Sequence, residues 1–121
     1  MPESSQRQKG IKAEDLAAAF LTQRGYHIVA RNFRCPRGEI DIIAYDQEVL
    51  CFIEVRSRDN ADFGEPLETI QTQKIDRIVR AAEAYLDQLP LPWPMMRFDA
   101  LGIVLTKPPE FSLRQEAFEA R

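Results

Sequence analysis

The sequence predicts an α/β fold in which helices flank a mixed central sheet, with the element order α-β-β-β-α-β. Two stretches have apolar residues at helical spacing, over residues 11–24 and 72–88. Four more are rich in β-branched and aromatic residues, as strands are, over residues 26–34, 39–45, 49–55 and 97–105. Because 121 residues without a Gly/Ser-rich linker suit one domain, we expect a disordered tail over residues 1–9 and a single domain over 10–121.

The boundaries of these elements follow from turn-forming and helix-breaking residues. The first helix is expected to end before Gly25, since glycine commonly stops a helix. The second is expected to begin at Thr72, a candidate N-cap, and the proline-rich connection over 90–96 cannot continue it. Residues 60–68 are typical of a loop. A short strand is expected at 111–113, within a C-terminal region whose acids form a solvated tail: Glu110, Glu116 and Glu119.

The strands over 39–45 and 49–55 form a predicted hairpin that carries acids among its apolar residues. Side chains alternate along a strand, so Glu39 shares a face with Asp41, and Glu54 shares a face with Arg56. If the connecting loop has an even number of residues, Asp41 faces Glu54 and Glu39 faces Arg56. An odd loop would separate the acids onto opposite faces.

Two opposed carboxylates repel each other, and burying them unpaired is costly. A hard divalent cation such as Mg²⁺ would offset that cost, and so would the guanidinium of Arg56. Glu14, beside the apolar stripe of the first helix, is either a further acid of this site or a first-turn acid that interacts favourably with the helix dipole.

The same residues carry a resemblance to known families. Asp41 followed by Glu54, Val55 and Arg56 is similar to the D…ExK core of PD-(D/E)XK nucleases. The blocks "GEIDIIA", "FIEVRSR", "RAAEAYL" and "RFD" resemble the YraN-like uncharacterised family, whose members resemble archaeal Holliday-junction resolvases in fold. The resemblance covers roughly residues 10–105. It implies a restriction-endonuclease-like fold.

The resemblance also implies a metal site and an activity. Asp41 and Glu54 would be ligands of Mg²⁺ or Mn²⁺, the carbonyl of Val55 would contribute, and Glu14 would match the helix-borne acid of the family. The implied function is metal-dependent hydrolysis of DNA phosphodiester bonds, with branched DNA among the candidate substrates. Arg56 stands where the nuclease pattern has lysine; it cannot act as a base, but it can hold a phosphate oxygen bidentately.

The remaining expectations concern partners and location. Five basic residues are candidates for contacts with a nucleic-acid backbone: Arg34, Arg37, Arg58, Lys74 and Arg77. Resolvase-like action would require a homodimer. Two alternatives stay open. Arg56 in place of the lysine suits a nucleic-acid-binding protein without catalysis. The acidic pI of about 5.2 and the proline-rich stretch over 90–96 suit a protein-interaction module anchored by Trp93. With no signal peptide and no membrane span, we expect a cytoplasmic protein.

Overall fold

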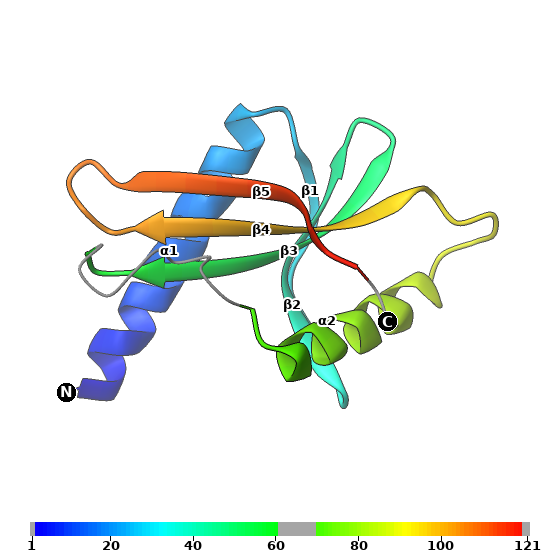
Figure 1. Ribbon diagram of the computed structural model, residues 1–121, viewed down its shortest axis with the longest axis horizontal. Helices are drawn as coiled ribbons and strands as arrows, with labels where there is room; N and C mark the ends of the chain where they lie inside the picture. Colours follow the sequence, from blue (N-terminus) through cyan, green and yellow to red (C-terminus); the bar gives the residue numbers. More distant parts are fainter. Residues whose placement is uncertain (1, 61–69, 120–121) are drawn as a thin grey trace.

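The computed structural model describes residues 2–60 and 70–119, and the side chains of 12–60 and 70–119. The elements follow in the order α1 (Pro2–Gln23), β1 (His27–Cys35), β2 (Gly38–Asp46), β3 (Val49–Arg58), α2 (Thr72–Leu86), β4 (Met96–Val104) and β5 (Glu110–Phe118). The strands form one sheet in the order β1-β2-β3-β4-β5, in which β3 and β4 are parallel and the other pairs are antiparallel (Figure 1). This confirms the predicted α/β fold with a mixed sheet, and it is consistent with a restriction-endonuclease-like core.

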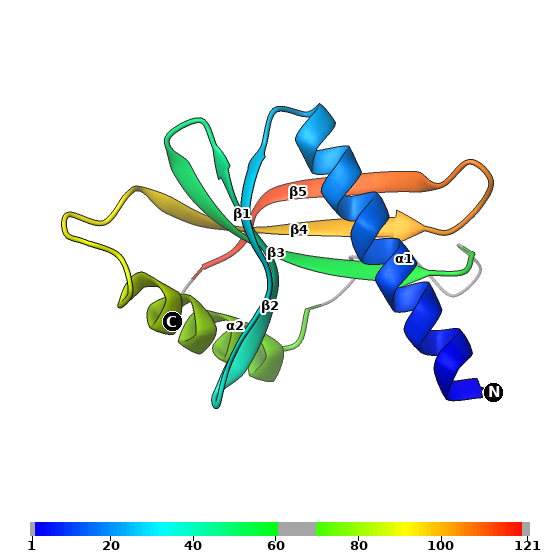
Figure 2. The same cartoon turned by 180° about the vertical axis from the view of Figure 1, so that it is seen from behind.

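The two helices cover opposite faces of the sheet, as the two opposed views show (Figures 1 and 2). The alternation along β3 sorts its apolar side chains between them. Cys51 and Ile53 pack with α1, whereas Leu50 and Phe52 pack with α2. Because β3 is buried on both faces, its sequence is an almost continuous apolar run, and an acid there must have a specific environment.

Helix α1 ends as the sequence predicts. Gly25 adopts a φ of 92°, and the N–H of Tyr26 donates to the carbonyl of Leu21, which is the pattern of a Schellman motif. The helix begins at Pro2 rather than near Ile11, since the intervening polar residues are mostly compatible with helix and Pro suits the first turn. The division into a tail over 1–9 and a domain over 10–121 stays a prediction.

Helix α2 begins at Thr72 as predicted, but its N-cap is Gln71 and not Thr72. The carbonyl of Gln71 accepts the first helical hydrogen bond, from the N–H of Ile75, and no side chain caps this end. A Cβ on Gly38 would lie 2.0 Å from the carbonyl oxygen of Arg77. Glycine is therefore required at the start of β2, where the strand touches the backbone of α2. The loop predicted over 60–68 lies almost wholly outside the described residues.

The C-terminal region corrects a sequence expectation. Instead of a short strand at 111–113 and a solvated tail, β5 runs from Glu110 to Phe118 and pairs with β4 along an edge of the sheet. Its polar residues alternate with apolar ones, because an edge strand packs only part of its surface. A register shift between Phe98 and Ala100 coincides with a φ of 52° at Glu116. The described helices include none that is long and apolar enough to cross a membrane.

Candidate metal-binding site

Of the two hairpin registers that the sequence left open, the structure has the one with an even loop. Strands β2 and β3 are joined by the two-residue loop of Gln47 and Glu48, and their last paired positions are Ile42 and Ile53. Asp41 and Glu54 are the next residue on each strand. They therefore lie at the point where the two strands stop pairing, which leaves room for groups other than the sheet to contact them.

Asp41 is half-buried and accepts a hydrogen bond at Oδ2 from the backbone N–H of Val55, at 2.8 Å. Burial raises the pKa of Asp41 to about 7, and the negative charge of Glu54 is the next cause. The Val55 N–H and the charge of Lys74 lower this pKa but do not compensate fully. Near neutral pH the carboxyl group of Asp41 is therefore only partly ionised.

Glu54 is only 4% exposed, and its Oε1 lies 2.9 Å from the ammonium Nζ of Lys74 in the first turn of α2. The sequence had suggested Arg56 as the internal cation of this site, and it had treated Lys74 only as a candidate phosphate contact. In the structure Lys74 pairs with Glu54, whereas Arg56 is half-buried on β3 opposite Gly102 of β4. Because the Lys74 side chain is 56% exposed, it can leave Glu54 without losing a buried environment.

The two other predicted acids lie elsewhere. Glu39 was expected to face Arg56, but β2 pairs only with β1 at this point, and Glu39 Oε2 lies 3.2 Å from Nε of Arg34. Glu14 accepts hydrogen bonds from Arg31 and Asn32 of β1, at 2.9 and 2.8 Å. Since α1 covers the opposite face of the sheet, the structure does not bring Glu14 to Asp41 and Glu54.

The carboxylates of Asp41 and Glu54 suit a metal site that water and substrate complete, and they do not suit a site made of protein side chains alone. Within the described ranges there is no group of three or more His, Cys, Asp or Glu side chains that could hold an ion. A closed cage built only from protein side chains is therefore not formed by these residues. Mg²⁺, in contrast, is commonly held by one or two carboxylates, and waters and substrate phosphates complete its octahedron. Asp41 and Glu54 fit that pattern.

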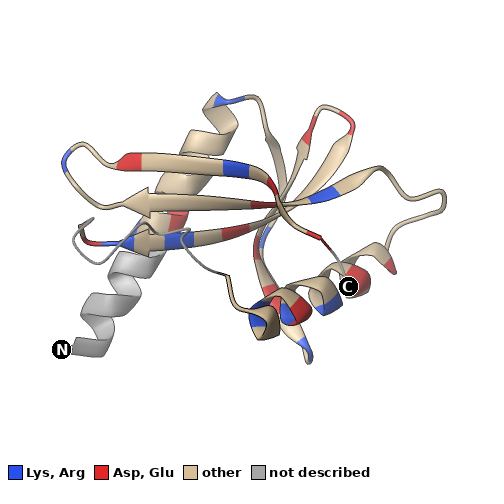
Figure 3. Cartoon of the chain, viewed as in Figure 1, with Lys and Arg blue, Asp and Glu red and all other residues tan. Residues whose placement is uncertain are grey.

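A polar cleft of about 270 Å³ adjoins the acid pair at the start of α2. Its lining residues are Glu39, Gln71, Gln73, Lys74, Arg77 and Ile78. The first half of α2 and the turn between β1 and β2 both carry basic residues, Arg37 among them (Figure 3). Two of the five candidate nucleic-acid contacts, Lys74 and Arg77, thus line one cleft, and the ion pair of Lys74 with Glu54 connects this cleft to the acid pair.

The other candidate contacts are more dispersed. Arg34 is exposed and pairs with Glu39, and Arg37 is exposed at the tip of the β1–β2 turn. Arg58 is half-buried at the end of β3, and its Nε has no hydrogen-bond partner among the parts of the chain that the structure describes. The Nε–H of Arg58 is therefore an unused donor. Arg58 lies four residues along β3 from Glu54, so it is not a direct neighbour of the acid pair.

Sequence reasoning missed a second buried acid. Asp99 of β4 is 0% exposed and accepts from Arg97 Nε at 2.9 Å, from the Tyr26 hydroxyl at 3.2 Å and from the N–H of Glu116 at 3.0 Å. Arg97 also donates to Asp46 at 2.8 Å. The alternation in "RFD" is the only signal for this network, since it places Arg97 and Asp99 on one face.

Comparisons with known proteins agree with the resemblance noted in the sequence. The model of a family described as "Uncharacterised protein family UPF0102" matches residues 13–103. A UPF0102 protein of Chlorobium phaeobacteroides (strain BS1) is 48% identical over 95 residues, which cover 78% of this chain and 75% of that protein. One of Chlorobaculum tepidum is 44% identical over 110 residues, or 91% of this chain and 85% of the relative. One of Nocardia farcinica is 42% identical over 97 residues, or 80% and 76%.

Proposed function

This chain belongs to the uncharacterised protein family UPF0102, and we propose that it is a divalent-metal-dependent nuclease that hydrolyses phosphodiester bonds of DNA. The observation that carries the proposal is the acid pair. Asp41 and Glu54 lie where the β2–β3 ladder ends, and burial, followed by the negative charge of Glu54, raises the pKa of Asp41 to about 7. Such a pair is stabilised by a cation.

Under this proposal Asp41 and Glu54 hold Mg²⁺ or Mn²⁺, and the carbonyl of Val55 contributes. The ion, when bound, would polarise the phosphate and make a water molecule more acidic. The chain's own role is to hold the two carboxylates in place. The Val55 N–H fixes one oxygen of Asp41, and burial among apolar neighbours keeps Glu54 from turning into solvent.

Basic residues around the pair would bind the substrate. Arg56 would clamp a non-bridging phosphate oxygen bidentately and stabilise negative charge that develops there. Lys74, which pairs with Glu54 and is largely exposed, would also reach a phosphate of the substrate, and Arg77 in the same cleft would contact a neighbouring phosphate. Arg34, Arg37 and Arg58 extend this basic surface along the DNA backbone.

The experiment is a cleavage assay on branched, flapped and single-stranded DNA with added Mg²⁺ or Mn²⁺. We expect the unmodified protein to cut at least one of these substrates. Asp41→Asn should lower the rate by about a hundredfold or more, since general positioning and electrostatic effects of this kind are that large. Asp76→Asn, an exposed acid of α2, is the matched control and should cut normally. No cleavage by the unmodified protein under any metal condition would refute the proposal.

A second candidate function is nucleic-acid binding without hydrolysis. The Lys74–Glu54 ion pair favours it, because this lysine already supplies part of the charge that a metal would supply. The two functions differ in calorimetry with Mn²⁺, in which only the nuclease should show binding that Asp41→Asn abolishes. A binding protein should instead bind DNA with an affinity that falls steeply between about 50 and 200 mM salt.

The same assays bear on the expected partners. Cutting both strands of a branched junction would use two copies of the chain, so we propose a homodimer on that substrate. Sedimentation of the protein with and without junction DNA tests it, and a monomer on the cleaved junction would contradict it.

A further inference from the structure

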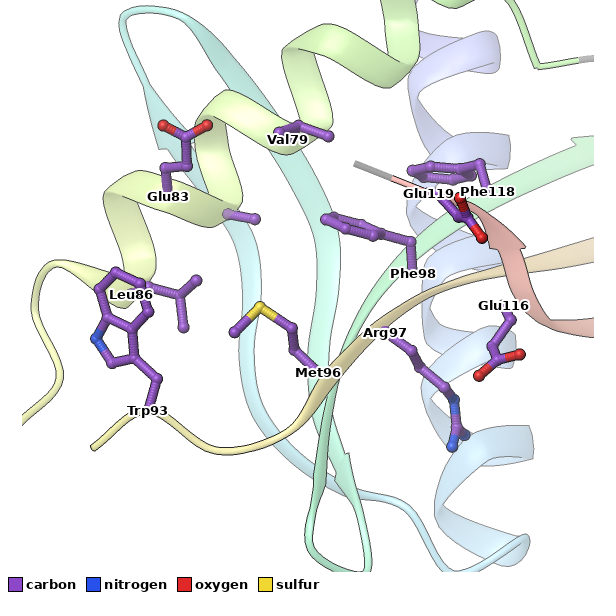
Figure 4. A pocket seen from close by; sticks show the side chains of 11 residues that line it. Val79, Glu83, Leu86, Trp93, Met96, Arg97, Phe98, Glu116, Phe118 and Glu119 are labelled. Atoms are coloured by element: carbon purple, nitrogen blue, oxygen red, sulfur yellow. The ribbon is translucent and has the colours of Figure 1, made fainter. Parts of the chain in front are cut away.

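A groove of about 530 Å³ lies between the second half of α2 and the ends of β4 and β5 (Figure 4). Val79 and Leu86 of α2 form one wall, Met96 and Phe98 of β4 and Phe118 of β5 line the sheet side, and Trp93 stands at the end of the groove. Its interior is thus apolar and aromatic. The groove is separate from the acid pair, because Lys74 at the first turn of α2 contacts Glu54 and does not line this groove.

Exposed apolar side chains gather in the connection between α2 and β4 and at the start of β4, where Trp93 and Met96 line the groove. Large hydrophobic residues that are exposed number five among those the structure describes, and four of them lie in or directly after the connection over 90–96. Their exposed fractions are 77% for Leu91, 44% for Trp93, 76% for Met95 and 38% for Met96. Apolar groups that are contiguous and exposed typically mark an interaction site, whereas single exposed ones do not.

The charges at the rim indicate which partner would fit. Glu83, Glu116 and Glu119 lie at the rim, and Glu83 is paired with Arg80. The only cation in the lining is Arg97, which is committed to Asp46 and Asp99. Within the described part of the chain, no ion-pair partner is found for Glu116 or Glu119. The rim therefore attracts positive charge, and a second copy that docked through the same groove would bring like charges together.

We propose that this groove binds the apolar face of a basic amphipathic helix from a partner protein. In this mode, apolar anchors at helical spacing enter the groove, and basic residues on the flanks of the helix meet the acidic rim. The wall formed by Val79 and Leu86 runs along α2, so an incoming helix could lie beside α2 over the uncovered part of the sheet. The inference does not depend on nuclease activity.

Trp93 is the only tryptophan and reports directly on the groove. The probe is a designed helical peptide with leucines on one face and lysines on the other, and its matched form has glutamates in place of the lysines. We expect the lysine peptide to shift Trp93 fluorescence to the blue in a saturable manner. The glutamate peptide should bind at least about tenfold more weakly, because like charges across an interface are strongly unfavourable.

Double variants test separately the acidic rim and the exposed apolar residues. Glu116→Gln with Glu119→Gln should weaken lysine-peptide binding about threefold to tenfold and reduce its salt dependence, as expected for exposed charge pairs. Glu48→Gln with Glu110→Gln removes the same charge elsewhere and should have no effect.

Leu91→Ser with Met95→Ser should weaken binding without unfolding the chain, since both side chains are exposed. Val29→Ser, an exposed apolar residue on β1, is the control. Absence of saturable binding, or equal binding of both peptides, would overturn the proposal. So would self-association in sedimentation that Leu91→Ser with Met95→Ser abolishes, because the occupant would then be a second copy.

Discussion

The two faces of the sheet each bury an acidic group, and their surroundings differ. On the α1 face, Asp99 is fully buried and receives three kinds of donor, the nearest from Arg97. On the α2 face, Asp41 and Glu54 lie side by side in the register, with the Lys74 ammonium 2.9 Å from Glu54 and a raised pKa at Asp41. A carboxylate surrounded by donors ties elements together, whereas a pair with too few donors is ready to bind a cation.

The largest expected loss of stability comes from removing Asp99, the acid that several donors surround. Asp99→Ala removes the main partner of Arg97, whose side chain is only 16% exposed. It should lower the free energy of unfolding by about 3–5 kcal/mol, because the buried guanidinium loses its countercharge. Urea unfolding measures it. Asp46→Ala is the control: its side chain is 28% exposed, so its effect should be clearly smaller. Equal losses would show that Asp99 is not the centre of the network.

Removing the charge of Asp41 should, in contrast, raise the stability of the protein. The pKa of Asp41 is raised from 3.8 to about 7, so the folded protein keeps a proton there that the unfolded chain has lost. Stability should therefore fall as the pH rises from about 4 to about 7. At pH values above this range, Asp41→Asn should be more stable than the unmodified protein, by on the order of 1–3 kcal/mol.

Urea unfolding across this pH range tests the prediction for Asp41. The difference between Asp41→Asn and the unmodified protein should shrink towards acidic pH, where Asp41 is neutral in both states. Asp76→Asn, on the surface of α2, should follow the unmodified protein at every pH. A stability difference independent of pH would contradict the raised pKa.

The smallest expected change in stability comes from replacing Lys74, the ion-pair partner of Glu54. Lys74→Met leaves Glu54 without its ion-pair partner, but the lysine is more than half exposed, so the loss of stability should be about 1 kcal/mol. Added Mn²⁺ should then raise the melting temperature of Lys74→Met more than that of the unmodified protein, since a bound ion stabilises the folded state. Equal shifts would show that lysine and metal do not compete for Glu54.

Local patterns predicted much of the fold and the centre of the site. The apolar periods identified both helices and four strands, and Gly25 marked the end of α1. The two-residue loop of Gln47 and Glu48 set the hairpin register that makes Asp41 and Glu54 neighbours. These features could be predicted because each depends on residues close together in the chain.

Contacts between distant segments could not be predicted in this way. The partner of Glu54 is Lys74, in the first turn of the next helix, and the partners of Asp99 come from three different parts of the chain, at Tyr26, Arg97 and Glu116. Glu14, which the family resemblance implied at the acid pair, lies on the opposite side of the sheet, where it accepts a hydrogen bond from Arg31. Each outcome depends on which face a helix covers and on how far it lies along the sheet.

The sequence by itself thus determined the elements and limited the hairpin to two registers, because backbone periodicity and a short loop leave little freedom. The two-residue loop of the structure selected the register in which Asp41 and Glu54 are neighbours. Only the tertiary structure decided which charges compensate which acids. Ion pairs form between side chains that packing brings together, and packing is set by the whole core. The same packing left the groove beside Trp93 uncovered, although its residues are far apart in the chain.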